Sequence, residues 1–223
     1  KYLRHKIYWN AIITTAIFEN YQDIQELTRL LVAYFYQNWV AGKTVARIKQ
    51  TSFNLLKLIK SNSPIEKIKE ELKNNLEYYG TTKSFKEELQ SSYVYGRRWD
   101  RAVLLLVEYF STDNNKENFI PLSANLHLEH ILPQTLNEDW SEIFTEEETE
   151  NWTNSLANLT LLSLRKNVQA QNYNFDQKKN AYANKDNVIS SFVITQDIMN
   201  ENKWNVESLE RRKENLIDRI YEK

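Results

Sequence analysis

The sequence contains no cysteine, and it has only three glycines and three prolines in 223 residues. Without cysteine there is no disulfide framework, thiolate nucleophile or thiolate zinc site, which suits a reducing cytoplasm. So little glycine and proline excludes collagen-like and linker-rich classes and disfavours a turn-rich all-β fold. No apolar run approaches the roughly 20 residues that cross a bilayer, and no signal-peptide pattern is visible at the start. We therefore expect a cytoplasmic location without membrane association.

Hydrophobic residues make up 41% of the sequence and aromatic residues 13%, which is enough to bury a core. The composition favours a mostly helical globule of one domain or two small ones. The first residue is Lys1 and not methionine. We therefore expect the chain to be the C-terminal part of a longer protein.

The net charge of −1 comes from 29 Lys and Arg against 30 Asp and Glu, which excludes a strongly basic nucleic-acid coat. The charges are unevenly distributed: residues 1–120 carry +5, residues 121–159 carry −8 and residues 160–223 carry +2. The acidic segment could be a solvated helix face or the surroundings of a cation site, and charge alone does not decide between them.

Residues 1–120 show the apolar spacing of helices. It predicts helices over 6–41, over 44–60, from Ser63-Pro64 to Gly80, and over 97–110. Ser63 is expected to be the N-cap, with Pro64 at the first helical position. The fold class of this first region is therefore a helical bundle.

From residue 121 onwards the pattern changes. Residues 123–133 are expected to be extended, 145–157 a helix capped by Thr145, 158–163 a short strand and 175–183 a helix. Ser208 is expected to cap a last helix. We therefore place a second region, mostly α with a small β component, over 121–223.

Two strings in this second region stand out. Glu129-His130-Ile131-Leu132-Pro133-Gln134 contains a His-x-x-Pro pattern, which is weak alone because chance produces it often. Asn158 and Asn167 then lie nine residues apart, one at the start of the expected strand and one at or just before a helix.

With both strings present, the chain resembles the HNH, or ββα-metal, endonucleases, and more closely the C-terminal nuclease domain of GmrSD-type, type IV restriction enzymes. The resemblance covers about residues 126–182. It implies a ββα-metal motif with a two-stranded hairpin, acting on modified or phage DNA. It also implies an N-terminal NTPase-like region or partner subunit that is not in this chain. The matching elements are LEHILPQ, ANLTLLS, Asn167, and Asn172…Phe175…Lys178…Tyr182.

The resemblance also implies roles. His130 falls on the general base and Asn158 on the residue that fixes the hairpin and the histidine ring, and both are assigned to the catalytic group. Glu129 and Asn167 fall on ligands of a divalent cation, Mg²⁺ or Mn²⁺. We expect phosphate contacts from Lys178 and, more weakly, from Arg165 and Lys166. Glu129 replaces the more usual Asp, and Ala157 a Gly often found before the middle Asn.

These residue types suit phosphodiester hydrolysis. A neutral imidazole can take a proton from water near neutral pH, and a cation held by hard oxygen ligands can stabilise the phosphate and the leaving oxygen. Strict strand alternation, however, puts the side chains of Glu129 and His130 on opposite faces. Two other functions stay open: a non-catalytic nucleic-acid-binding or regulatory module that keeps the fold, and a purely structural helical scaffold.

Overall fold

The computed structural model describes residues 2–111, 120–122, 125–163, 172–183 and 192–221. The chain divides into two compact units, residues 1–89 (unit 1) and residues 90–223 (unit 2). This division differs from the boundary at residues 120 and 121 that the sequence suggested, because the helix expected over 97–110 packs within unit 2. None of the described helices is long and apolar enough to cross a membrane.

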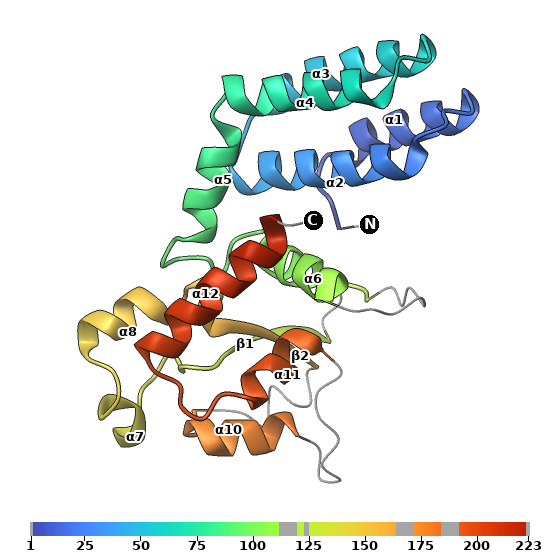
Figure 1. The fold of residues 1–223 in the computed structure, drawn as a ribbon. Helices are drawn as coiled ribbons and strands as arrows, with labels where there is room; N and C mark the ends of the chain where they lie inside the picture. Colours follow the sequence, from blue (N-terminus) through green and yellow to red (C-terminus); the bar gives the residue numbers. More distant parts are fainter. Residues whose placement is uncertain (1, 112–119, 123–124, 164–171, 184–191, 222–223) are drawn as a thin grey trace. The chain divides into compact units, whose positions relative to one another are not determined.

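Unit 1 consists of consecutive helices among its described residues (Figure 1). They are α1 (Lys6–Phe18), α2 (Ile24–Val40), α3 (Val45–Lys60), α4 (Ile65–Tyr78) and α5 (Thr81–Leu89). The sequence predicted α3 closely. It predicted one helix over 6–41 where the structure has two, and α5 was not anticipated. Pro64 precedes the first helical residue of α4 and is its N-cap, so Ser63 is not.

Left-handed residues end the first three helices of unit 1. Asn20, Gly42 and Asn62 have φ values of 53°, 63° and 48°. After α1, the Asn20 amide donates to the Ile17 carbonyl and the Tyr21 amide to the Ala16 carbonyl, which is the Schellman pattern. Asparagine tolerates this conformation better than most residues, and it therefore breaks the apolar run that suggested one long helix.

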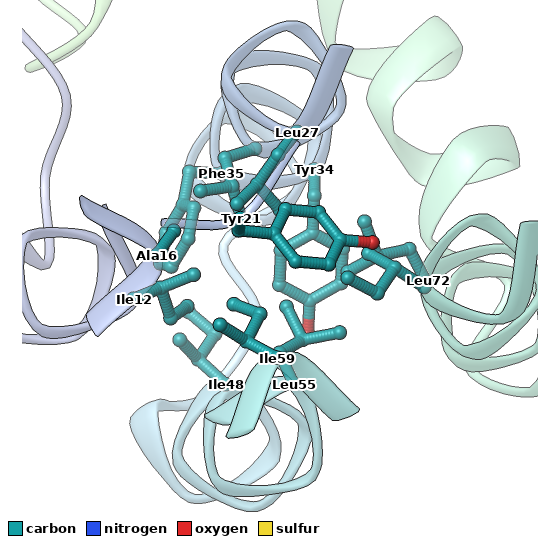
Figure 2. Close-up of a cluster of buried hydrophobic side chains, with 12 residues drawn as sticks. Ile12, Ala16, Tyr21, Leu27, Tyr34, Phe35, Ile48, Leu55, Ile59 and Leu72 are labelled. Carbon is teal, nitrogen blue, oxygen red and sulfur yellow. The ribbon is translucent and has the colours of Figure 1, made fainter. Parts of the chain in front are cut away.

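The core of unit 1 is a cluster of buried aliphatic and aromatic side chains contributed by α1 to α4 (Figure 2). Tyr21, in the break between α1 and α2, is buried in this cluster and donates its hydroxyl hydrogen to the Ser63 carbonyl at 2.7 Å. The buried members are Ile12, Ala16, Tyr21, Leu27, Leu31, Tyr34, Phe35, Ile48, Leu55, Ile59, Ile68 and Leu72.

Unit 2 combines helices with a two-stranded hairpin (Figure 1). Its first half contains α6 (Asp100–Ser111), β1 (Leu126–His130), α7 (Glu138–Ser141), α8 (Glu146–Trp152) and a 3₁₀ turn, η1 (Leu156–Asn158). Its second half contains β2 (Leu159–Ser163), α10 (Phe175–Tyr182), α11 (Val193–Met199) and α12 (Val206–Tyr221). Thr145 and Glu148 form the expected capping box of α8. Asn205, and not Ser208, caps the start of α12, because its side-chain Oδ1 accepts a hydrogen bond from the Ser208 amide.

The hairpin pairs β1 with β2 in antiparallel register, with Glu129 opposite Thr160 and His130 opposite Leu159. These strands form a two-stranded sheet within the described residues. The prediction of a mostly helical fold with a small hairpin is therefore confirmed.

A separate hydrophobic cluster supports the hairpin of unit 2. Ile131 and Leu132, which follow β1 directly, are fully buried in it beside Trp140 and Trp204. The segment after His130 is thereby anchored in the core, which fixes where β1 ends.

Candidate functional site

His130 is the last residue of β1, and its half-buried ring meets two side chains from other segments of unit 2. Its Nε2 lies 3.1 Å from Oδ1 of Asn154. The Tyr95 ring packs edge-on against the imidazole, with the ring centroids 4.3 Å apart. Because an amide oxygen only accepts hydrogen bonds, this contact is a hydrogen bond in the tautomer that carries its proton on Nε2 and leaves Nδ1 unprotonated.

The two partners of His130 are held to each other by backbone hydrogen bonds. The Asn154 carbonyl accepts from the amides of Val94 at 2.8 Å and Tyr95 at 3.0 Å. The Asn154 Oδ1 also lies 3.4 Å from Nε2 of Gln134. Three distant segments of the chain therefore fix the plane of the His130 ring.

The surroundings of His130 favour a neutral ring. Burial lowers the pKa of His130 to about 4; the hydrogen bond with Asn154 opposes the shift, and the Lys178 charge adds to it. A neutral imidazole has one nitrogen able to accept a proton, as a general base must, and the lowered pKa also makes this nitrogen a weaker base than a free imidazole.

Asn158 is fully buried and uses all the hydrogen-bonding capacity of its side chain. Its Nδ2 donates to the carbonyls of Leu132 and Thr153, both at 2.8 Å. Its Oδ1 accepts from the Leu132 amide at 2.7 Å and from Nε1 of Trp204 at 3.1 Å. Asn158 therefore fixes the chain just after His130, and its side chain has no capacity left for a substrate.

Glu129 makes none of these contacts and lies in a buried ion pair with Lys178. Nζ of Lys178, on α10, is 2.5 Å from Oε1 of Glu129 and 2.6 Å from the His130 carbonyl oxygen. The hydroxyl of Tyr182 donates to the same Oε1 at 3.2 Å. The side chains of Glu129 and His130 thus contact different partners, as strand alternation predicts.

Burial raises the pKa of Glu129 and lowers that of Lys178, whereas the attraction between the two groups opposes both shifts. Only 1% of the Lys178 side chain and 8% of the Glu129 side chain are exposed. The Lys178 ammonium therefore donates inside the protein, and this arrangement does not offer the phosphate contact expected of it.

The described residues do not fit a divalent cation by themselves. Among them, no group of three or more His, Asp or Glu side chains could hold a metal ion. Glu129, the expected carboxylate ligand, already binds an ammonium group through Oε1. Asn167, the other expected ligand, lies outside the described residues.

Only some of the expected site residues lie in the described part of the chain. The structure brings together His130, the backbone around Asn158, and the Glu129–Lys178 pair, whose lysine reaches the His130 carbonyl. Arg165 and Lys166 lie outside the described residues. Sequence reasoning missed Tyr95 and Asn154, because neither belongs to a recognisable string and their relation to His130 exists only in the folded chain.

A comparison with known protein families supports the resemblance. The family described as GmrSD restriction endonucleases, C-terminal domain, matches residues 63–219. This stretch contains His130, Asn154 and Asn158, and it leaves residues 1–62 outside the match. No curated protein matches the chain.

Proposed function

We propose, from the premise that this chain belongs to the family of GmrSD restriction endonuclease C-terminal domains, that unit 2 hydrolyses phosphodiester bonds of DNA as an HNH-type nuclease with His130 as general base. The observation that carries the proposal is the contact between Nε2 of His130 and Oδ1 of Asn154. It holds the ring in place and leaves Nδ1 to take a proton from the attacking water.

The remaining residues act through position. Asn158 fixes the backbone at Ile131 and Leu132, and Lys178 holds the His130 carbonyl. Together they set the direction in which the imidazole points. A general base placed within hydrogen-bond reach of its water contributes about 10²–10⁴-fold to the rate.

The proposal includes modified or phage DNA as the substrate, restriction in the cytoplasm as the setting, and an N-terminal NTPase-like region or subunit as the partner. It also includes a requirement for Mg²⁺ or Mn²⁺, which can stabilise the charge that develops on the phosphate. Asn167 is the proposed ligand outside the described residues, and the buried ion pair of Glu129 makes this carboxylate the less favoured one.

The test is nicking of supercoiled plasmid, unmodified and modified, with Mg²⁺ or Mn²⁺ and with EDTA. We expect His130→Ala to lower the nicking rate about 10²–10⁴-fold and to keep its circular dichroism spectrum, since the change leaves the buried apolar groups in place. EDTA should abolish nicking by the wild type.

His5→Asn is the matched control, because it removes a histidine from unit 1 at a left-handed position that asparagine tolerates. Equal nicking by the wild type and His130→Ala would show that His130 is not the base. If the wild type binds DNA but nicks neither the unmodified nor the modified plasmid with either metal, the result would favour the non-catalytic module.

A further inference from the structure

The two units carry opposite net charge. Residues 1–89 contain 14 Lys and Arg against 9 Asp and Glu, a net charge of +5. Residues 90–223 contain 15 Lys and Arg against 21 Asp and Glu, a net charge of −6. Phosphate contacts by Lys and Arg supply most of the sequence-independent affinity of proteins for DNA. A nuclease unit of net charge −6 gains little of this affinity from its overall charge, so the basic groups of unit 1 are the better source.

Helix α3 carries the most one-sided charge among the helices of unit 1. Its 16 residues include four basic side chains and no acidic ones. Ile48, Leu55 and Ile59 are buried in the core cluster of unit 1 (Figure 2). From Ala46 onwards the exposed positions of the helix fall on the opposite side, where Ala46, Lys49, Gln50, Phe53, Lys57 and Lys60 lie within about 100° of arc.

This surface combines cations with an exposed aromatic ring. We call Lys49, Phe53, Lys57 and Lys60 the α3 lysine face. Phe53 is 53% exposed, and Nζ of Lys57 lies 4.6 Å from its ring centroid. From Lys49 to Lys60 the helix rises about 16 Å, enough to meet more than one phosphate of a duplex.

The lysines of this face differ from two exposed lysines on α4 and α5. Lys73 and Lys83 pair with Glu77 and Glu87 one turn further along their helices. In the part of the chain that the structure describes, the three lysines of the α3 lysine face are outside ion-pair distance of any carboxylate. Glu71, an acidic residue of α4, accepts a hydrogen bond from Asn54 of α3 at 2.7 Å.

We propose that the α3 lysine face docks on the phosphate backbone of double-stranded DNA, independently of sequence. The proposal rests on the proposed function only in taking DNA as the polyanion that this chain meets. It assigns a role to a helix that lies outside the residues matched by the family. Binding here raises the local concentration of DNA without supplying any chemical group to the reaction.

The test compares two triple variants that lose the same charge. One carries Lys49→Gln, Lys57→Gln and Lys60→Gln. The other, the matched control, carries Lys73→Gln, Lys83→Gln and Lys86→Gln, all at exposed positions of α4 and α5. Binding to a fluorescent duplex is measured by anisotropy between 50 and 200 mM KCl in EDTA, so that the result does not depend on cleavage.

We expect the α3 triple to reduce the slope of log affinity against log salt by about 3, since each phosphate contact contributes roughly 0.9. The control triple should keep the slope of the wild type. The double variant Lys49→Gln/Lys60→Gln should reduce the slope by about 2. It replaces the triple variant in the test if the triple variant does not fold.

Unchanged DNA binding by the α3 triple, or equal losses of DNA binding in both triples, would overturn the proposal. So would a wild type that binds phosphatidylserine vesicles but not DNA, if the α3 triple alone weakens the binding to vesicles. A chain that binds DNA through this face but cuts none contradicts the proposed function and leaves this proposal standing. If the wild type cuts DNA and both triples bind DNA as the wild type does, the proposed function stands and the proposal for the α3 lysine face is contradicted.

Discussion

Asn154 is the residue whose role is least visible in the sequence and best defined by the structure. Its side chain meets the His130 ring, and its carbonyl holds the amides of Val94 and Tyr95. The oxygen of the side chain, rather than its size, selects which ring nitrogen carries the proton.

We expect Asn154→Leu to lower the cleavage rate about 10–100-fold, the range typical of partners that orient a functional side chain. Asn154→Asp keeps an accepting oxygen and should keep the proton on Nε2. The measurement is the ¹⁵N chemical shifts of the His130 ring, alongside plasmid nicking.

Gln134→Ala is the control, because Gln134 lies beside the same oxygen at 3.4 Å but is not the hydrogen-bond partner of the ring. If Asn154→Leu keeps the wild-type ¹⁵N chemical shifts of the His130 ring and the wild-type nicking rate, Asn154 does not orient His130.

At the scale of elements, the Glu129–Lys178 pair joins β1 to α10. Tyr182, one turn after Lys178, donates to the same carboxylate. Removal of one member of a buried pair leaves the other charge desolvated and uncompensated, whereas removal of both does not.

Lys178→Met should therefore lower the free energy of unfolding by about 3–5 kcal/mol, and Lys178→Met with Glu129→Gln should lower it by less. Urea unfolding followed by circular dichroism measures both. The same experiment with Mn²⁺ tests the expected metal role of Glu129. Stabilisation of the wild type by Mn²⁺ that Glu129→Gln abolishes would restore this residue as a ligand.

Much of the element pattern could be predicted from the sequence, because apolar periodicity and capping boxes are local signals. The spacing of Ile48, Leu56 and Ile59 predicts α3, and Thr145 with Glu148 predicts the start of α8. Asn20 is also a local signal, but asparagine is common in other settings, so its left-handed turn was missed. The partners of His130 could not be predicted, because they depend on contacts between distant segments.

At the scale of the whole molecule, each unit has a hydrophobic cluster of its own. The family match begins at Ser63, just before α4, and so takes in α4 and α5 of unit 1 but not α1 to α3. The boundary of the match and the boundary of the units are therefore different.

A protein comprising residues 90–223 should fold alone and unfold in one cooperative step, because its cluster is complete without unit 1. Thermal unfolding followed at the far- and near-ultraviolet circular dichroism bands checks this. Non-coincident transitions, or no near-ultraviolet signal, would show that unit 2 needs unit 1.

The saturated amide of Asn158 affects how a library of variants would be interpreted. No other side chain of similar size offers two donors and two acceptors in this arrangement, so most replacements bury an unsatisfied group at a cost of about 1–3 kcal/mol. In a cellular screen that scores nuclease activity, variants at position 158 would then be depleted through loss of abundance, whatever the chemistry at His130. Scores at the two positions become comparable only after each variant is normalised to the amount of folded protein in the cell.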